Sequence, residues 1–206
     1  MPEVSVNSKQ IKNTFNSNSS IKDVANYILT NDSQKNNPII TEVYADGKKY
    51  VDIDERYLEV LKMGQIKKLQ ITVRSSVELA FEALDSANQY IDTIINKTYL
   101  LTESYQQNKL EQANNNFIDL IEVTDLFIQL MAKIHRNFKT NFYQEYTKPK
   151  SLQKLEIHLL SILKAMIPAK ENNDIIMLCD LLEYELVDNL KMWKVKVIPV
   201  LKKMKG

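Results

Sequence analysis

The chain of 206 residues is long enough for one large domain, or for one domain with a small addition. An apolar fraction of 44% predicts a packed core, and the low content of glycine (3) and proline (5) favours long uninterrupted helices. The single cysteine excludes an internal disulfide framework, and so few glycines exclude a glycine-rich phosphate-binding loop.

The net charge of +1 hides an uneven distribution along the chain. Residues 75–130 carry 2 basic and 9 acidic side chains, whereas residues 131–206 carry 14 basic and 8 acidic ones. An acidic helical half packed beside a basic half accounts for this pattern, and the alternative is an electropositive face for nucleic acid or membrane. Only Arg56, Arg74 and Arg136 are arginines, which favours the first interpretation and makes nucleic acid the less favoured partner.

The sequence shows no recognisable targeting signal. Its N-terminus lacks the charged and then apolar pattern of a signal peptide, and no stretch approaches the ~18 apolar residues of a membrane span. A single cysteine, Cys179, also fits a reducing compartment. We therefore expect a cytoplasmic protein without a membrane partner.

The first 74 residues divide into two parts. Residues 1–37 hold few apolar anchors and predict a flexible segment, apart from a short amphipathic helix at about 20–30 that Ser20 would cap. Residues 38–74 predict a small β-β-α-β unit packed on the helices after it, because the Asp46-Gly47 pair signals a hairpin. In the last strand, Leu69, Ile71 and Val73 alternate with polar residues.

From residue 75 the apolar period changes from 2 to about 3.5, which predicts an antiparallel four-helix bundle over 75–206. The third helix is expected to stop before Pro168, and the fourth to span roughly 171–197 and to be kinked or ended by Pro199. We call the line of residues that each helix is expected to turn toward the core its seam. The seam of the first helix is Ala80, Leu84, Ala87, Ile91, Ile94, Thr98 and Leu101. The seam of the second helix is Ala113, Phe117, Leu120, Thr124, Phe127, Met131, Ile134 and Phe138.

No combination of residues predicts catalysis, a cofactor or a metal. His135 and His158 lack the glutamate three residues earlier that a carboxylate metal site in a bundle requires. Cys179 lies among Leu178, Asp180 and Leu182, which predicts a buried structural thiol rather than a reactive one. We therefore expect a protein that is not an enzyme.

The candidate binding residues are aromatic. Phe138, Phe142 and Tyr146 recur at a spacing of four, with Tyr143 beside them, where the second helix should be ending. One interpretation is that this stripe extends the helix and packs on the bundle or on the sheet. The other is an exposed patch that receives a helix or strand of a partner protein.

Residues 75–193 also resemble a known family. The segments Ser76-Val77-Glu78-Leu79, Ala83-Leu84-Asp85-Ser86-Ala87 and Tyr90-Ile91 are similar to the first long helix of the flagellin export chaperones. Asn108-Lys109-Leu110-Glu111-Gln112-Ala113 resembles the start of their next helix, and Asn173-Asp174 before Leu178, Leu181-Leu182 and Trp193 resembles their last one. The resemblance implies a non-enzymatic bundle that clasps an amphipathic helix of an export substrate and holds it unassembled.

Our first hypothesis is therefore a protein-binding helical bundle that acts as a chaperone or adaptor, and the resemblance implies a role in flagellar export. The alternatives are a self-associating structural protein that forms a homodimer, and a nucleic-acid-binding protein that uses residues 131–206.

Overall fold

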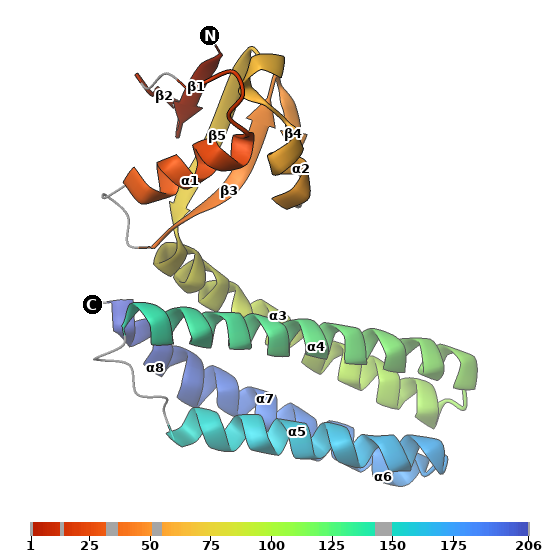
Figure 1. The fold of residues 1–206 in the computed structure, drawn as a ribbon. Coiled ribbons are helices and arrows are strands. Elements are labelled where there is room, and N and C mark those ends of the chain that lie inside the picture. The colour runs from red at the N-terminus through yellow and green to blue at the C-terminus, as the bar shows by residue number, and fades with distance from the viewer. Residues whose placement is uncertain (1, 13–14, 32–36, 51–54, 143–149, 206) are drawn as a thin grey trace. The chain divides into compact units, whose positions relative to one another are not determined.

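The computed structural model describes residues 2–12, 15–31, 37–50, 55–142 and 150–205 (Figure 1). The chain divides into two compact units, which we call the sheet unit (Met1–Leu79) and the helical unit (Ala80–Gly206). The sheet unit contains β1 (Glu3–Val6), β2 (Lys9–Gln10), α1 (Ile21–Asn31), β3 (Pro38–Ala45), β4 (Lys48–Tyr50), α2 (Glu55–Val60), a 3-10 turn (Met63–Gln65) and β5 (Lys68–Ser75).

The sheet has five strands in the order β2-β1-β5-β3-β4, in which β1 is parallel to β5 and the other pairs are antiparallel. The prediction of a flexible segment over residues 1–37 was therefore wrong for β1 and β2. Val4 is buried in the core, and the Asn7 side chain extends the pairing with β5 by bonding both N–H and C=O of Val73, at 2.9 and 3.0 Å. Pairing across more than sixty residues leaves no local signal in so short a strand.

The predicted hairpin and the predicted short helix are both present. Asp46 and Gly47 have φ values of 49° and 82° and join β3 to β4, as a two-residue turn with positive φ at both positions requires. Ser20 caps α1, because its hydroxyl oxygen accepts from the Asp23 N–H at 3.1 Å. The Asp23 carboxylate in turn accepts from the Ser20 N–H at 2.7 Å and from the Ser20 hydroxyl at 2.8 Å. These hydrogen bonds from Ser20 lower the pKa of Asp23.

The core of the sheet unit forms where α1 covers one face of the sheet. The inward side chains of β5 alternate as predicted, and Leu69, Ile71 and Val73 are buried. They pack in one cluster with the apolar face of α1, which consists of Ile21, Val24 and Ile28.

The helical unit consists of long helices, which confirms the prediction of a mainly α protein. We call its last helical stretch, residues 175–205, the C-terminal rod. The elements are α3 (Ser76–Gln106), α4 (Leu110–Asn141), α5 (Lys150–Glu171), and then the rod with α6 (Ile175–Asp180), a π-helical segment (Leu181–Leu186), α7 (Val187–Met192), a second π-helical segment (Trp193–Val197), α8 (Ile198–Lys202) and a 3-10 turn (Lys203–Lys205).

Contacts between side chains place neighbouring helices antiparallel. Along each pair of helices, residue numbers rise on one helix as they fall on the other. The contacts that show this are Lys97–Asp119 and Asn116–Ser104 for α3 with α4, Lys194–Asp92 and Lys202–Asp85 for α3 with the rod, and Asn189–Leu155 and Glu185–His158 for α5 with the rod. Lys194 and Lys202 of the rod are thus used in ion pairs within the helical unit.

The predicted seams form the core of this unit. All seven seam positions of α3 are buried, and the eight of α4 are buried except Phe117, which is half-buried. The largest fully buried side chain among the described residues is Trp193 of the rod, whose ring packs edge-on against Phe127 at 5.3 Å between ring centroids.

Two prolines have less effect on the helices than the sequence predicted. The helix predicted to stop before Pro168 continues to Glu171 and ends where Asn173, with a φ of 55°, turns the chain. Pro168 has no N–H to donate to the carbonyl of Lys164, and the helix continues for only three residues past it. The rod continues past Pro199, because the preceding π turn, closed by the Ile198 N–H donating to Trp193 O, gives its ring room.

Candidate protein-binding groove

An apolar groove with a volume of about 460 Å³ runs between α4 and α5. Both helices contribute residues at helical spacing, so that one face of each forms a wall. The lining residues are Phe117, Ile121, Thr124, Asp125 and Ile128 of α4, with Leu163, Met166, Ile167, Lys170 and Glu171 of α5.

The groove leaves large apolar side chains in contact with water. Ile121 is 37% exposed and Ile167 is 57% exposed, although both are β-branched aliphatic residues suited to a core. Ile118 and Leu160, one helical turn from lining residues, are exposed as well. Single exposed apolar residues are common on proteins, but a continuous set beside a hollow is typical of a binding surface.

Lys170 closes one end of the groove without leaving its charge available there. Its Nζ donates to the Tyr105 hydroxyl at 2.8 Å and to Asn114 Oδ1 at 2.6 Å, and it lies 5.3 Å from the centroid of the Phe117 ring. The other charged lining groups are the carboxylates of Asp125 and Glu171, and both residues are exposed. The groove is therefore lined mainly by apolar side chains, and its exposed charged groups are the carboxylates of Asp125 and Glu171, which we call the acidic margin.

The structure separates the aromatic residues that the sequence predicted as a binding patch. Phe138 is fully buried and packs on Phe81, with 4.9 Å between ring centroids, while Phe142 is half-buried beside both. Phe138 is thus part of the core, in agreement with the packing interpretation and not with an exposed patch. Tyr143 and Tyr146 lie outside the described residues.

Sequence reasoning missed the groove because its residues stand next to the seams. Each exposed or half-buried isoleucine of the groove comes directly after a buried residue, in the pairs Leu120-Ile121, Phe127-Ile128 and Met166-Ile167. A seam in a simple bundle needs only two apolar positions in seven. The extra isoleucines were therefore an available signal for a second apolar surface.

Cys179 and His158 both lie beside carboxylates of the helical unit. Cys179 is partly buried, and desolvation, followed by the nearby carboxylates of Glu183 and Asp180, raises the pKa of its thiol. A raised pKa leaves little of the nucleophilic thiolate at neutral pH. His158 bonds Glu185 on one side of its ring and Asn189 on the other, at 3.0 and 3.1 Å. Among the described residues, no group of three or more metal-ligating side chains converges.

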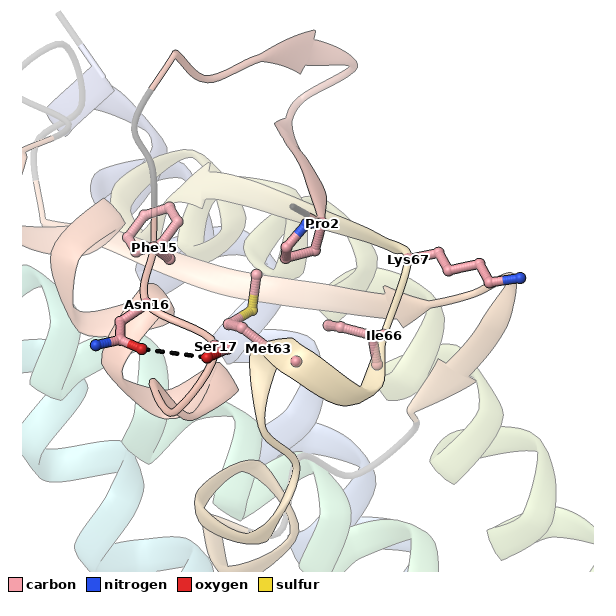
Figure 2. Close-up of a pocket in the computed structure, with 8 residues that line it drawn as sticks. Pro2, Phe15, Asn16, Ser17, Met63, Ile66 and Lys67 are labelled. Carbon is pink, nitrogen blue, oxygen red and sulfur yellow. Dashed lines mark hydrogen bonds between the residues drawn. The ribbon is translucent and has the colours of Figure 1, made fainter.

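A second, more open depression of about 750 Å³ lies in the sheet unit (Figure 2). It forms where Gly64 approaches the segment at Ser17 so closely that an added Cβ would lie 3.1 Å from the Ser17 carbonyl oxygen. Figure 2 shows Lys67, a charged residue at its margin, extending away from the hollow. Of the described residues that line it, Asn16 and Ser17 hydrogen-bond each other, and this depression is a weaker candidate than the groove.

Fold and groove together define a mainly helical protein with an apolar groove between two antiparallel helices. Within the described part of the chain, no helix is long and apolar enough to cross a membrane. The chain belongs to the family described as Domain of unknown function (DUF8042), whose model matches residues 82–196 and so spans both walls of the groove. No curated protein and no solved structure matches the chain significantly. The resemblance to flagellin export chaperones therefore stays a prediction.

Proposed function

We propose that this protein is a non-enzymatic chaperone or adaptor that binds the apolar face of an amphipathic helix of another protein in the groove between α4 and α5. The observation that carries the proposal is the exposure of Ile121 and Ile167 on opposite walls of one apolar hollow. Burying such side chains against a partner gains roughly 25 cal/mol for each Å² of apolar surface removed from water.

The dimensions of the groove suit a helix. Its α4 wall runs from Phe117 to Ile128, which corresponds to about 16 Å or three turns at ~1.5 Å per residue. A helix of that length presents apolar side chains at i, i+3 or i+4, and i+7, the pattern by which helices bind in grooves. The acidic margin at Asp125 and Glu171 favours a helix that carries basic residues beside its apolar face.

The resemblance to flagellin export chaperones suggests a class of partner. Under this proposal the partner is a cytoplasmic export substrate whose helix would otherwise assemble or aggregate. Masking an apolar helix until it is needed requires no chemistry, and it agrees with the lack of an activated nucleophile at Cys179. The flagellar setting is the most specific part of the proposal, and it depends on the resemblance alone.

A pair of matched substitutions on α5 tests the proposal. Ile167 lines the groove and is 57% exposed, whereas Ile157 is 61% exposed but does not line it. In affinity capture from the native cell, the wild type and Ile157→Asp should retain the same stoichiometric partner. Ile167→Asp should weaken binding of that purified partner by roughly 10- to 100-fold, because a carboxylate must then be desolvated in an apolar site.

Two results would count against the proposal. One is that no partner is recovered with the wild type under any condition. The other is that the two variants bind an identified partner equally well, which would place its binding site elsewhere on the molecule. Far-UV circular dichroism of both variants controls for folding, and neither side chain is buried enough to make the fold depend on it.

A further inference from the structure

The charges of α4 are segregated along its length. From Leu110 to Asp125 the helix carries four acidic side chains and no basic one, and from Leu126 to Asn141 it carries Lys133, Arg136 and Lys139 and no acidic one. The helix macrodipole favours acids near the first turn and bases near the last. It does not require them in the central turns, where most of these residues lie.

Five exposed residues at the centre of α4 form a symmetric pattern. Glu122, Asp125, Gln129, Lys133 and Arg136 are spaced by three, four, four and three residues, so they occupy one face of the helix. Asp125 and Glu122 lie four and seven residues before Gln129, and Lys133 and Arg136 lie four and seven residues after it. An identical helix placed antiparallel to α4, with the two Gln129 residues opposite each other, therefore brings its bases opposite the acids of α4 and its acids opposite the bases.

Within the part of the chain that the structure describes, most of this pattern has no side-chain partner. Among the described residues, the only side-chain hydrogen bond of the five is internal, between Gln129 Nε2 and Asp125 Oδ2 at 2.6 Å. Beside Gln129 on the same part of the helix lies Leu126, which is 53% exposed. An apolar side chain flanked by charges of both signs is typical of a surface that contacts another helix.

We propose that a second copy of this chain occupies this face, with the two α4 helices antiparallel about a two-fold axis near Gln129. Glu122 then faces Arg136 of the second copy, and Asp125 faces Lys133 of the second copy. Two-fold symmetry repeats each contact, so four ion pairs surround the two Leu126 side chains. A different protein would need no such symmetry in the pattern, and this favours a second copy over a foreign helix.

The interface is small and electrostatic, which sets its expected behaviour. An interface formed by one pair of helices buries a small surface area, below about 1,200 Å², and complexes of that size are weak and transient. Exposed ion pairs are also screened within about 8 Å at physiological salt. The dimer should therefore depend on concentration and should dissociate as the salt concentration rises. This proposal does not depend on the groove, although Asp125 borders both surfaces.

Exchange of charges between the two ends of the pattern tests the proposal. Glu122→Arg alone and Arg136→Glu alone each bring like charges together at two places, so each should weaken the dimer by roughly 10-fold or more. The double variant Glu122→Arg/Arg136→Glu restores opposite charges and should dimerise like the wild type. Mixing the two single variants should also give a dimer, because one supplies only bases and the other only acids at the facing positions.

Sedimentation equilibrium of the purified full chain at low and high salt measures these outcomes. Lys164→Glu, an exposed reversal on α5 outside the pattern, controls for the change in net charge. A wild type that is monomeric at all concentrations would overturn the proposal. A dimer that neither single variant weakens would overturn it as well, because the interface would then lie on another face.

Discussion

Replacing Trp193 by alanine is expected to lower the free energy of unfolding of the helical unit by about 3–5 kcal/mol, the usual cost of removing a large aromatic side chain from a core. Trp193 is 1% exposed and packs edge-on against Phe127 of α4. Its removal would leave a cavity between the rod and α4, which long helices cannot close by a local shift.

Urea unfolding followed by far-UV circular dichroism measures this effect, since the substitution removes the only tryptophan of the chain. Val195→Ala is the matched control in the same rod, because Val195 is 70% exposed and should change the stability by less than about 0.5 kcal/mol. A loss below about 1 kcal/mol for Trp193→Ala would show that the rod is not packed on α4 as described.

The second large effect concerns Asn189, which joins the rod to α5. Asn189 is 2% exposed, and its side chain makes three hydrogen bonds. Its Oδ1 accepts from Trp193 Nε1 at 3.0 Å, and its Nδ2 donates to Leu155 O and to His158 Nδ1, both at 3.1 Å. Because the indole N–H can only donate, the amide orientation is fixed, and His158 Nδ1 must accept. The proton of a neutral His158 then lies on Nε2 and points to Glu185.

We expect Asn189→Ala to cost about 2–3 kcal/mol, because it leaves the buried indole N–H without an acceptor and opens a small cavity. In the background of Trp193→Phe, which has no N–H to satisfy, the same substitution should cost about 1 kcal/mol less. Urea unfolding of the four proteins in this cycle, followed by circular dichroism, gives the coupling energy. Strictly additive losses would contradict the network.

Much of the helical unit could be predicted from the sequence because its core has a local period. Residues such as Leu84, Ile91 and Leu120 recur every three or four positions, and helix geometry alone brings them to one face. The hairpin at Asp46-Gly47 was equally accessible, because positive φ is a property of the turn residues themselves.

Features that depend on distant residues could not be predicted in this way. The strand β1 is too short for a period and exists because β5 provides its hydrogen-bonding partner. The network around Asn189 joins this residue to His158, which lies 31 residues earlier on another helix. Only the packing of the two helices brings these groups together. The groove was missed for a related reason. The seam positions indicate which apolar residues are buried, but they do not indicate which apolar residues beside them are left without a helix packed over them.

Both proposed surfaces lie on α4, and this has a consequence for how the protein would work. The groove uses the side of α4 that faces α5, while the symmetric charge pattern lies on its outer face. Asp125 belongs to both. A dimer through the outer face would therefore place two grooves close to one axis, and a partner with two amphipathic helices would bind more tightly through both.

The claim on which the proposed function depends is that a partner occupies the groove, and site-specific photo-crosslinking in the native cell tests it most directly. A photoreactive amino acid is placed at Ile167 and, in a separate protein, at Ile157 as the control. We predict one dominant crosslinked protein at position 167, which is absent at position 157 and is lost when Ile121→Asp is added. Equal crosslinking at both positions, or none at position 167, would contradict the account.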